Sequence, residues 1–386
     1  MGESVNKSTV IFYESLPINN QIFLHRFIVA QITELIEIGY NIILCTGDNP
    51  NDLKEKFIDF YNINAVAINC NDYNCCKKLN PVIVFTSRID SAVKIKFTNI
   101  FGSNNFTKIL WYGGVIPEES YLRRKSKVRR LILLILEKMA LKWADIVLLP
   151  TQSMLNYLDM NNRLPENTKY LVVPNAIEAS PPRYKDSRKL WGIKETNSPV
   201  IGYCGGLSKW QCFEETLDFI KNIQAIEPDI IFLVITYDPQ NALKMIFEKG
   251  ISNAIVKHTT PDKVYQYVQA FDVGILFRYE NVVNTAAFPL KYLDYISNGV
   301  PVITTNAVKA ITSDVQKTFG YTISFEQIDY ISIIAHIKNV SSNKESTGKK
   351  LREHVTSKWT FDVVNKSIRN VYTEIYKKIP SDARNP

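Results

Sequence analysis

Glycine, histidine and long apolar runs are all scarce in this 386-residue sequence. Glycine accounts for 15 residues and histidine for four, whereas soluble proteins average about 7% glycine. No apolar run approaches the ~18 residues of a membrane span, and the start of the chain has neither a basic nor an apolar stretch, so no signal peptide is expected. The tripeptide Asp-x-Asp, a common carboxylate pair for a divalent cation, is also absent. We therefore expect no membrane-spanning helix and no bound metal.

The overall composition is that of a folded globular protein. Hydrophobic residues make up 46% and charged residues 22%, which excludes an intrinsically disordered chain. The net charge of +8 is too dilute to indicate nucleic-acid binding. The six cysteines lack the spacing of a disulfide framework, so free thiols and a cytoplasmic location are expected. At roughly 150 residues per domain, the length predicts two to three domains.

Short β-branched runs alternate with amphipathic stretches of helical length, which predicts an α/β fold with parallel sheets. In the first half the predicted strands are 10–14, 41–46, 65–69, 82–86, 108–112 and 145–149, with a last one at 171–173. The pattern restarts with predicted strands at 200–204, 230–236, 254–257, 273–277 and 302–304. The helices predicted between them lie at 21–38, 91–101, 127–143, 152–159, 213–226, 240–248, 261–271 and 289–297.

The two halves are joined by a segment of different composition. Residues 178–199 are rich in Pro, Ser, Lys and Arg and are interpreted as a linker. We expect one domain at 1–177, a second at 178–358, and a C-terminal helix at 359–386 that packs back across the domains. Two βα domains of similar size usually bind ligand in the cleft between them.

The second half contains the residues that indicate a ligand. A predicted strand ends at Gly205-Gly206, where backbone N–H groups can approach a phosphate, although such a pair is often only a tight turn. Arg278 follows another strand, and Lys291 and Asp294 share one face of a helix that opens at Pro289. An arginine, a lysine and a helix N-terminus that converge form a site for a diphosphate; the alternative is a solvated helix start with surface charges.

The order of these motifs resembles the nucleotide-sugar half of glycosyltransferase family 4, in particular its bacterial surface-polysaccharide branch. The motifs are a strand with Gly-Gly-Leu, Lys-Trp-Gln, Arg-x5-Asn-x4-Pro-x-Lys-x2-Asp-Tyr and Asn-Gly-Val-Pro-Val-Ile. They lie between residues 173 and 304, and the first half fits more loosely. The resemblance implies the GT-B architecture, in which two Rossmann-like domains face each other across a cleft. It also implies sugar transfer with retention from a nucleotide donor, without a metal or another cofactor.

Carried over by position, the resemblance gives roles to several residues. Arg278 and Lys291 would bind the donor diphosphate and support catalysis. Asp294 would bind the ribose hydroxyls, and Asn284 would order the loop beside the transferred sugar. The other donor-side residues would be Gly205, Gly206, Lys209 and His258, the last of them near the base.

Several positions depart from the pattern of the family. Ala286 and Asp294 stand where many relatives have glutamates, and Gly206 and Gln211 replace a common basic pair. Gly113 replaces a histidine that usually contacts the transferred sugar. These departures favour an alternative in which the chain is a non-catalytic subunit that partners an active transferase, whereas the retained basic residues oppose it. Another GT-B enzyme, such as a sugar epimerase, is a third hypothesis.

A basic segment in the first half precedes an apolar helical pattern. Six basic residues fall within 123–130, and apolar residues follow at 128, 131, 132, 135 and 139. A basic amphipathic helix favours contact with a membrane surface; the alternatives are a core helix with a solvated basic start and a pocket for an acidic acceptor. The acceptor side of the cleft would then include Glu118, Glu119, Arg123 and Arg124.

Together, the residues and the resemblance predict a retaining, metal-independent glycosyltransferase of the hexosyltransferase type. It would move a sugar from a nucleotide diphosphate sugar to a glycan or lipid-linked glycan in surface polysaccharide biosynthesis, and family frequency favours a UDP-sugar. We expect it in the cytoplasm, with peripheral contact to the inner face of the membrane through 123–139, and without a nucleic-acid partner.

Overall fold

The computed structural model describes residues 8–18, 22–59, 61–102, 105–193 and 197–380. Within these ranges the chain forms two compact units. The first unit contains the residues up to Ala176 together with those from Phe361 onward, and the second contains Ile177–Thr360. The C-terminal segment therefore returns to the first unit.

A seven-stranded parallel sheet forms the centre of the first unit, with the strand order β3-β2-β1-β4-β5-β6-β7. Its inner strands β1 and β4 are buried along their whole length, as apolar runs in a parallel sheet usually are. The strands are β1 (Thr9–Tyr13), β2 (Asn41–Thr46), β3 (Val66–Asn69), β4 (Ile83–Thr86), β5 (Thr107–Trp111), β6 (Ile146–Leu149) and β7 (Lys169–Val172). The connecting helices are α1 (Ile22–Ile38), α2 (Pro50–Leu53), the π-helical turn η1 (Lys54–Asp59), α3 (Tyr73–Cys76), α4 (Ile89–Thr98), α5 (Ile116–Arg124), α6 (Lys127–Trp143) and α7 (Gln152–Met160).

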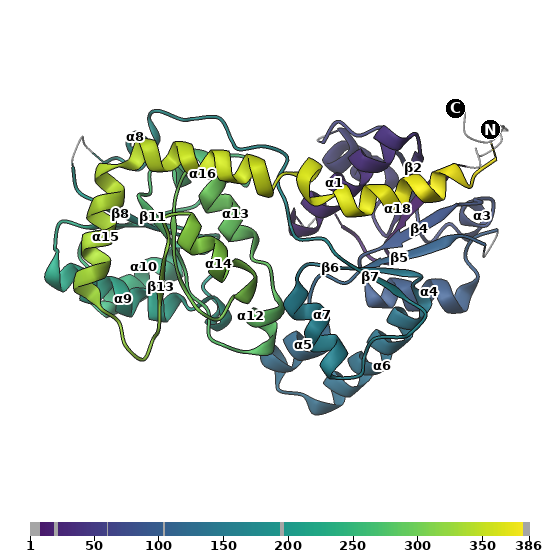
Figure 1. The fold of residues 1–386 in the computed structure, drawn as a ribbon, viewed down its shortest axis with the longest axis horizontal. Helices are drawn as coiled ribbons and strands as arrows, with labels where there is room; N and C mark the ends of the chain where they lie inside the picture. The colour runs from purple at the N-terminus through teal and green to yellow at the C-terminus, as the bar shows by residue number, and fades with distance from the viewer. Residues whose placement is uncertain (1–7, 19–21, 60, 103–104, 194–196, 381–386) are drawn as a thin grey trace. The chain divides into compact units, whose positions relative to one another are not determined.

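Two C-terminal helices, α17 (Phe361–Val364) and α18 (Lys366–Lys377), complete the first unit. The yellow helix α18 lies beside the purple helix α1 (Figure 1). The side chain of Tyr372 is fully buried there, and its hydroxyl donates to Gln31 Oε1 at 2.8 Å. The Tyr40 hydroxyl donates to the backbone carbonyl of Tyr372, also at 2.8 Å. Apolar burial and these two buried hydrogen bonds attach the end of the chain to its beginning.

A six-stranded parallel sheet forms the centre of the second unit, with the strand order β10-β9-β8-β11-β12-β13. The strands are β8 (Val200–Cys204), β9 (Ile231–Ile235), β10 (Ala254–Lys257), β11 (Val273–Leu276), β12 (Val302–Thr305) and β13 (Tyr321–Ile323). The helices are α8 (Ser187–Leu190), the 3-10 turn η2 (Lys209–Gln211), α9 (Phe213–Ile226), α10 (Pro239–Lys249), α11 (Val264–Val268), α12 (Val282–Ala286), α13 (Leu290–Ser297), α14 (Lys309–Lys317), α15 (Tyr330–Ser342) and α16 (Lys344–Lys358).

The predicted α/β class with parallel sheets is confirmed, and the predicted strands agree with the observed ones to within a few residues, whereas α14, α15 and α16 were not predicted. The edge strand β13 was not predicted, because three residues are too few to show a strand pattern. The predicted helix at 261–271 is reduced to α11. The predicted C-terminal helix is interrupted between α17 and α18 at Asn365, whose buried side chain accepts a hydrogen bond from Gln31 Nε2 at 3.1 Å.

Each sheet has one point at which its strand order reverses. In the first sheet this point lies between β1 and β4, and in the second it lies between β8 and β11. The connections on either side of such a point leave in opposite directions, so the carboxyl ends of the two strands border an open crevice, the usual ligand site of an open α/β sheet. The polar residues that follow β1, β4, β8 and β11 are therefore the first candidates for a site.

Candidate functional site

The turn after β8 needs glycine for two reasons. Gly205 has a φ of +146°, a conformation that side chains rarely adopt, and its N–H donates to the carbonyl of Ile235 at 2.8 Å. A Cβ atom at Gly205 would also overlap the end of the Lys291 side chain. The carbonyl of the next residue, Gly206, accepts a hydrogen bond of 2.5 Å from the hydroxyl of Tyr203. The turn thus opens the space that the lysine amine occupies.

Lys291 enters this space from α13, which begins directly after Pro289. Its ammonium donates to Gln211 Oε1 and lies 4.8 Å from the centroid of the Tyr203 ring. Burial and then the positive charge of Arg278 lower the pKa of Lys291 to about 7, although Cys204 and Asp294 act in the opposite direction. A lysine with so low a pKa is poorly solvated and gains much from an anion.

Arg278 reaches the same place from the end of β11. Its Nη1 donates to the carbonyl of Phe277 at 2.7 Å and to that of Gln211 at 3.4 Å. Its backbone is fixed by Thr305, whose hydroxyl donates to the Arg278 carbonyl at 2.6 Å. Burial lowers the pKa of Arg278 as well. In the described part of the chain, its guanidinium contacts these neutral carbonyls and forms no ion pair with a carboxylate.

Gln211 is therefore the shared neutral partner of both cations. Its side-chain oxygen accepts from Lys291, and from the Tyr203 hydroxyl at 3.3 Å, while its backbone oxygen accepts from Arg278. The sequence marked Gln211 only as a departure from a basic position, and it did not indicate Tyr203. The alternation of side chains along β8, which directs Tyr203 away from its neighbours Gly202 and Cys204, could have found the tyrosine.

The other predicted donor-side residues are placed more loosely. Asp294 lies half-buried on α13, close enough for its charge to act on Lys291. Asn284 is buried, and its side-chain amide donates to the Tyr279 carbonyl at 2.8 Å, so it shapes the turn before α12. His258, directly after β10, and Lys209, in η2, are both exposed. The structure thus brings Gly205, Arg278, Lys291 and Asp294 together in the second unit and adds Gln211 and Tyr203 to them.

The predicted acceptor-side residues lie on α5 in the first unit. Glu118 is buried and accepts hydrogen bonds from Arg130 Nε at 2.7 Å and Arg163 Nη2 at 2.8 Å. Burial would raise the pKa of Glu118, but these hydrogen bonds and one from Tyr157 lower it to about 2. Glu118 is therefore an ionised structural anchor and not a proton acceptor poised near neutral pH.

The neighbours of Glu118 are more accessible. Burial raises the pKa of the half-buried Glu119, whereas the charge of Arg123 lowers it. Arg123 and Arg124 are exposed.

Helix α6 directs its apolar stripe outward. Val128, Leu131, Ile132 and Ile135 are each more than half exposed, with fractions of 71%, 60%, 53% and 53%. The interpretation of these four residues as part of a core is therefore wrong, because the buried side of α6 consists of Glu137, Ala140, Leu141 and Trp143. Among the described helices, none is sufficiently long and apolar to span a membrane.

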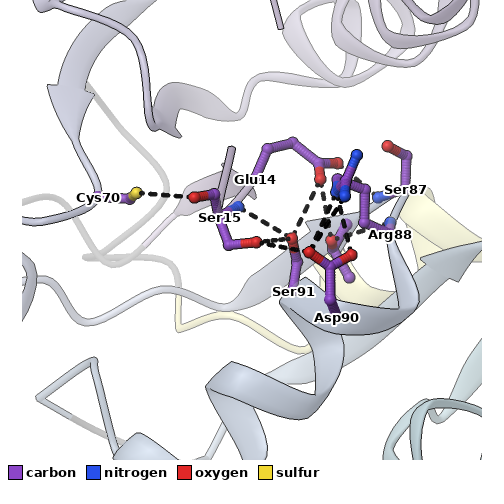
Figure 2. Close-up of polar contacts among 8 residues, drawn as sticks. Glu14, Ser15, Cys70, Ser87, Arg88, Asp90 and Ser91 are labelled. Atoms are coloured by element: carbon purple, nitrogen blue, oxygen red, sulfur yellow. Dashed lines mark hydrogen bonds and ion pairs between the residues drawn. The ribbon is translucent and has the colours of Figure 1, made fainter. Parts of the chain in front are cut away.

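A second polar cluster, which was not predicted from the sequence, lies at the reversal point of the first sheet. Figure 2 shows Glu14, from the end of β1, directed toward Ser87, Arg88 and Ser91, which follow β4. Glu14 Oε1 accepts from the Ser87 N–H at 2.6 Å, and Oε2 accepts from the Ser91 hydroxyl at 3.3 Å. Burial raises the pKa of Glu14 to about 7, against the effect of the Ser87 hydrogen bonding. Polar residues directly after two inner strands were the signal that could have found it.

Comparison with known proteins finds a family model that matches part of the second unit. Residues 198–341 match the family model of the glycosyl transferases group 1. TuaH of Bacillus subtilis strain 168, a glycosyltransferase assigned to teichuronic acid biosynthesis, is 29% identical over 185 residues. This alignment covers 46% of the present chain and 44% of TuaH, so it spans less than half of that relative.

Solved structures match nearly the whole chain in fold. A glycosyltransferase from Rickettsia africae has a TM-score of 0.68 at 16% identity and covers 97% of this chain and 100% of its own. HepE from Anabaena, solved with UDP and glucose, also has a TM-score of 0.68, at 11% identity, and covers 95% of this chain and 99% of its own. The two sheets therefore have a GT-B-like arrangement of strands and helices.

Replacing Lys291 by methionine should stabilise the protein at neutral pH. The lysine titrates at 10.5 when unfolded and at about 7 when folded, so the native state loses stability as the pH falls through this window. The effect amounts to about 4 kcal/mol, and Lys291→Met should remove it. Urea unfolding of both proteins at pH 7 and pH 9.5 measures how the free energy of unfolding of each changes with pH.

The matched control for this experiment is Lys349→Met, which removes a lysine whose side chain is 79% exposed. This control should keep the wild-type pH dependence of the free energy of unfolding. A Lys291→Met variant with the same dependence as the wild type would show that the lysine is not desolvated in the folded protein.

Proposed function

We propose that the chain is a group 1 glycosyltransferase, the family whose model matches its residues 198–341, and that it transfers a sugar from a nucleotide diphosphate sugar to a glycan acceptor. The observation that carries this proposal is the convergence of Arg278 and Lys291 on the Gly205 turn. Both cations are desolvated, and both have only neutral hydrogen-bond partners among the described residues. A diphosphate supplies the two negative charges that such a pair lacks.

We propose UDP as the nucleotide of the donor. HepE, which shares the fold, was solved with UDP-glucose, and this supports a UDP-sugar as the donor. In this model the diphosphate contacts Arg278 and Lys291, while Asp294 accepts hydrogen bonds from the ribose hydroxyls. Asn284 acts indirectly, because its amide fixes the Tyr279 carbonyl and hence the loop beside the transferred sugar.

The proposed transfer proceeds with retention of configuration. The bond between the anomeric carbon and the diphosphate oxygen breaks, and the acceptor oxygen forms its bond to that carbon on the same face. The acceptor proton passes to the departing phosphate oxygen. Negative charge grows on the diphosphate as the bond breaks, so Arg278 and Lys291 would stabilise the transition state more than the bound donor. In this proposal the two side chains take the role that a divalent cation has in other transferases.

We further propose that the acceptor is a surface glycan or a lipid-linked glycan. The relative TuaH supports a role in surface polysaccharide biosynthesis. The outward apolar stripe of α6 supports a lipid-linked acceptor, since it follows the exposed basic residues Arg123 and Arg124 on the chain. In this proposal α6 inserts its apolar side chains between lipid headgroups, while the basic residues at the end of α5 bind anionic lipids.

The donor proposal predicts that Arg278→Ala and Lys291→Ala each weaken UDP binding about tenfold to a hundredfold, the loss expected for one charge-assisted contact. Calorimetric titration with UDP measures the change, and Lys349→Ala is the control.

UDP release from a panel of UDP-sugars, with and without EDTA, then tests turnover and metal independence. Unchanged UDP affinity in both variants would overturn the donor site, and tight UDP binding without turnover of any donor and acceptor would favour a non-catalytic subunit.

The two glycines of the turn should respond differently to alanine. Gly205→Ala places a Cβ on the Lys291 amine and forces a strained φ, so UDP affinity should fall at least about tenfold. Gly206→Ala would meet the exposed ring of Tyr237 at 3.1 Å, which can move aside, and Gln211 Nε2 at 3.4 Å, which is an ordinary contact distance. Titrations of both variants with UDP provide the comparison, and equal losses would contradict the proposed position of Lys291.

The membrane proposal predicts that Leu131→Glu with Ile135→Glu lowers binding to phosphatidylglycerol vesicles at least about tenfold, since two inserted apolar side chains are lost. Leu243→Glu with Phe247→Glu on α10 is the matched control, with the same spacing and exposures of 51% and 84%. Cosedimentation at low and high salt measures binding, which should weaken with salt. Equal binding of the two double variants, or no wild-type binding, would contradict the proposal.

A further inference from the structure

The polar cluster of the first unit, here called the Glu14 cluster, consists of Glu14, Ser15, Ser87, Arg88, Asp90 and Ser91 (Figure 2). It lies at a position where an α/β sheet usually binds ligand. Strands β1 and β4 are neighbours, with Phe12 opposite Phe85 in the register. Glu14 and Ser87 follow these two residues at equal distance, so they meet at the carboxyl edge of the sheet. This is the point at which the strand order reverses, and no part of the proposed donor site in the second unit uses it.

An arginine and an aspartate form the accessible part of the cluster. Arg88 Nε donates to Asp90 Oδ1 at 3.0 Å, and Arg88 Nη2 donates to Asp90 Oδ2 at 3.2 Å. The two side chains are 28% and 42% exposed, so solvent reaches both. The Ser15 hydroxyl also donates to Asp90, at 3.1 Å, which links the end of β1 to the start of α4 (Figure 2).

Glu14 positions this pair through the neighbouring residues Ser87 and Ser91. It is 2% exposed and holds the segment before α4 through the Ser87 N–H and the Ser91 hydroxyl. The cluster thus presents an accessible donor, Arg88, and an accessible acceptor, Asp90, next to a backbone segment that Glu14 holds in place.

The charges of the cluster select the class of ligand. The charges of Arg88 and Asp90 cancel in their ion pair, and Glu14, whose pKa is raised to about 7, adds only a partial negative charge, so the cluster offers a phosphate or a carboxylate no net positive charge. A sugar hydroxyl instead both donates and accepts, and it can bind the guanidinium and the aspartate at the same time. Neighbouring hydroxyls of a neutral sugar therefore match the cluster better than an anion does.

We propose that Arg88 and Asp90, positioned by Glu14, form a subsite for a neutral sugar residue of the acceptor glycan. The proposal rests on the proposed function, because a glycosyltransferase needs a second sugar site besides that of its donor. Arg88 and Asp90 contact the sugar hydroxyls directly. Glu14 is a positioning residue that acts through the backbone of Ser87.

The experiment uses saturation-transfer NMR on the full chain with the methyl glycosides of glucose, galactose and N-acetylglucosamine. At least one of them should bind, and Arg88→Ala and Asp90→Asn should each weaken its binding at least about tenfold, the loss of one charge-assisted contact. The control is Asp218→Asn, which removes the carboxylate of an exposed ion pair with Lys249 in the second unit. Glucose 6-phosphate, which carries the charge that the cluster disfavours, should bind more weakly than the neutral glycosides.

Glu14 is tested by two variants of similar size. Glu14→Gln keeps an oxygen that accepts from the Ser87 N–H, and it should retain most of the glycoside binding. Glu14→Leu removes this acceptor and should lose the binding. Equal binding by these two variants, each with an unchanged circular dichroism spectrum, would overturn the positioning role.

Three results would overturn the subsite itself. They are the absence of a saturation-transfer signal for all three glycosides, equal glycoside binding by wild type and Arg88→Ala, and tighter binding of glucose 6-phosphate than of the neutral glycosides. A parallel UDP titration separates the two hypotheses. If UDP fails to bind while the glycosides depend on Arg88, the donor proposal fails and the sugar site stands. If UDP binds and the glycosides do not, only the subsite fails.

Discussion

The candidate donor site depends on two cations that are held close together without an anion among their described hydrogen-bond partners. Arg278 and Lys291 share Gln211, whose amide oxygen and backbone oxygen each accept one of them. Neutral acceptors satisfy the donors but do not cancel the charge, so Lys291 responds with a lowered pKa. Burial of these two charges therefore costs free energy in the folded protein, and a diphosphate bound as proposed would offset that cost. Such a balance between stability and binding is typical of functional sites.

The topology of the sheets explains why the polar groups gather where they do. In a parallel sheet the carboxyl ends of all strands lie along one edge, and only at the reversal point do the flanking connections leave room for a ligand. In the second unit this point collects Gly205 from β8 and Arg278 from β11. In the first unit it collects Glu14 from β1 and Arg88 from β4. The two units thus place polar groups at the same point of the sheet but with different charge: two cations in the second unit, and an ion pair with a buried glutamate in the first.

The sequence predicted the parts of the site that depend on local pattern. The glycine pair, Arg278 and Lys291 each stand at the end of a strand or the start of a helix, and strand periodicity locates those boundaries. The contacts of Gln211 and Glu14 could not be predicted in this way. Gln211 meets a lysine 80 residues away, and Glu14 meets a backbone amide 73 residues away. Such pairings follow from the order of the strands, which local periodicity does not determine.

Helix α6 shows that local periodicity also cannot predict which face of a helix is exposed. Its periodicity predicted an amphipathic helix correctly, but periodicity alone does not say which face is buried. The buried ionic network decides this: Glu137 is 1% exposed and pairs with Arg163, while Arg130 pairs with Glu118. Because these two residues of α6 are seven apart, they lie on one side of the helix and hold that side inward. Ion pairing on the inner side leaves the apolar stripe on the outside, where a lipid surface could cover it.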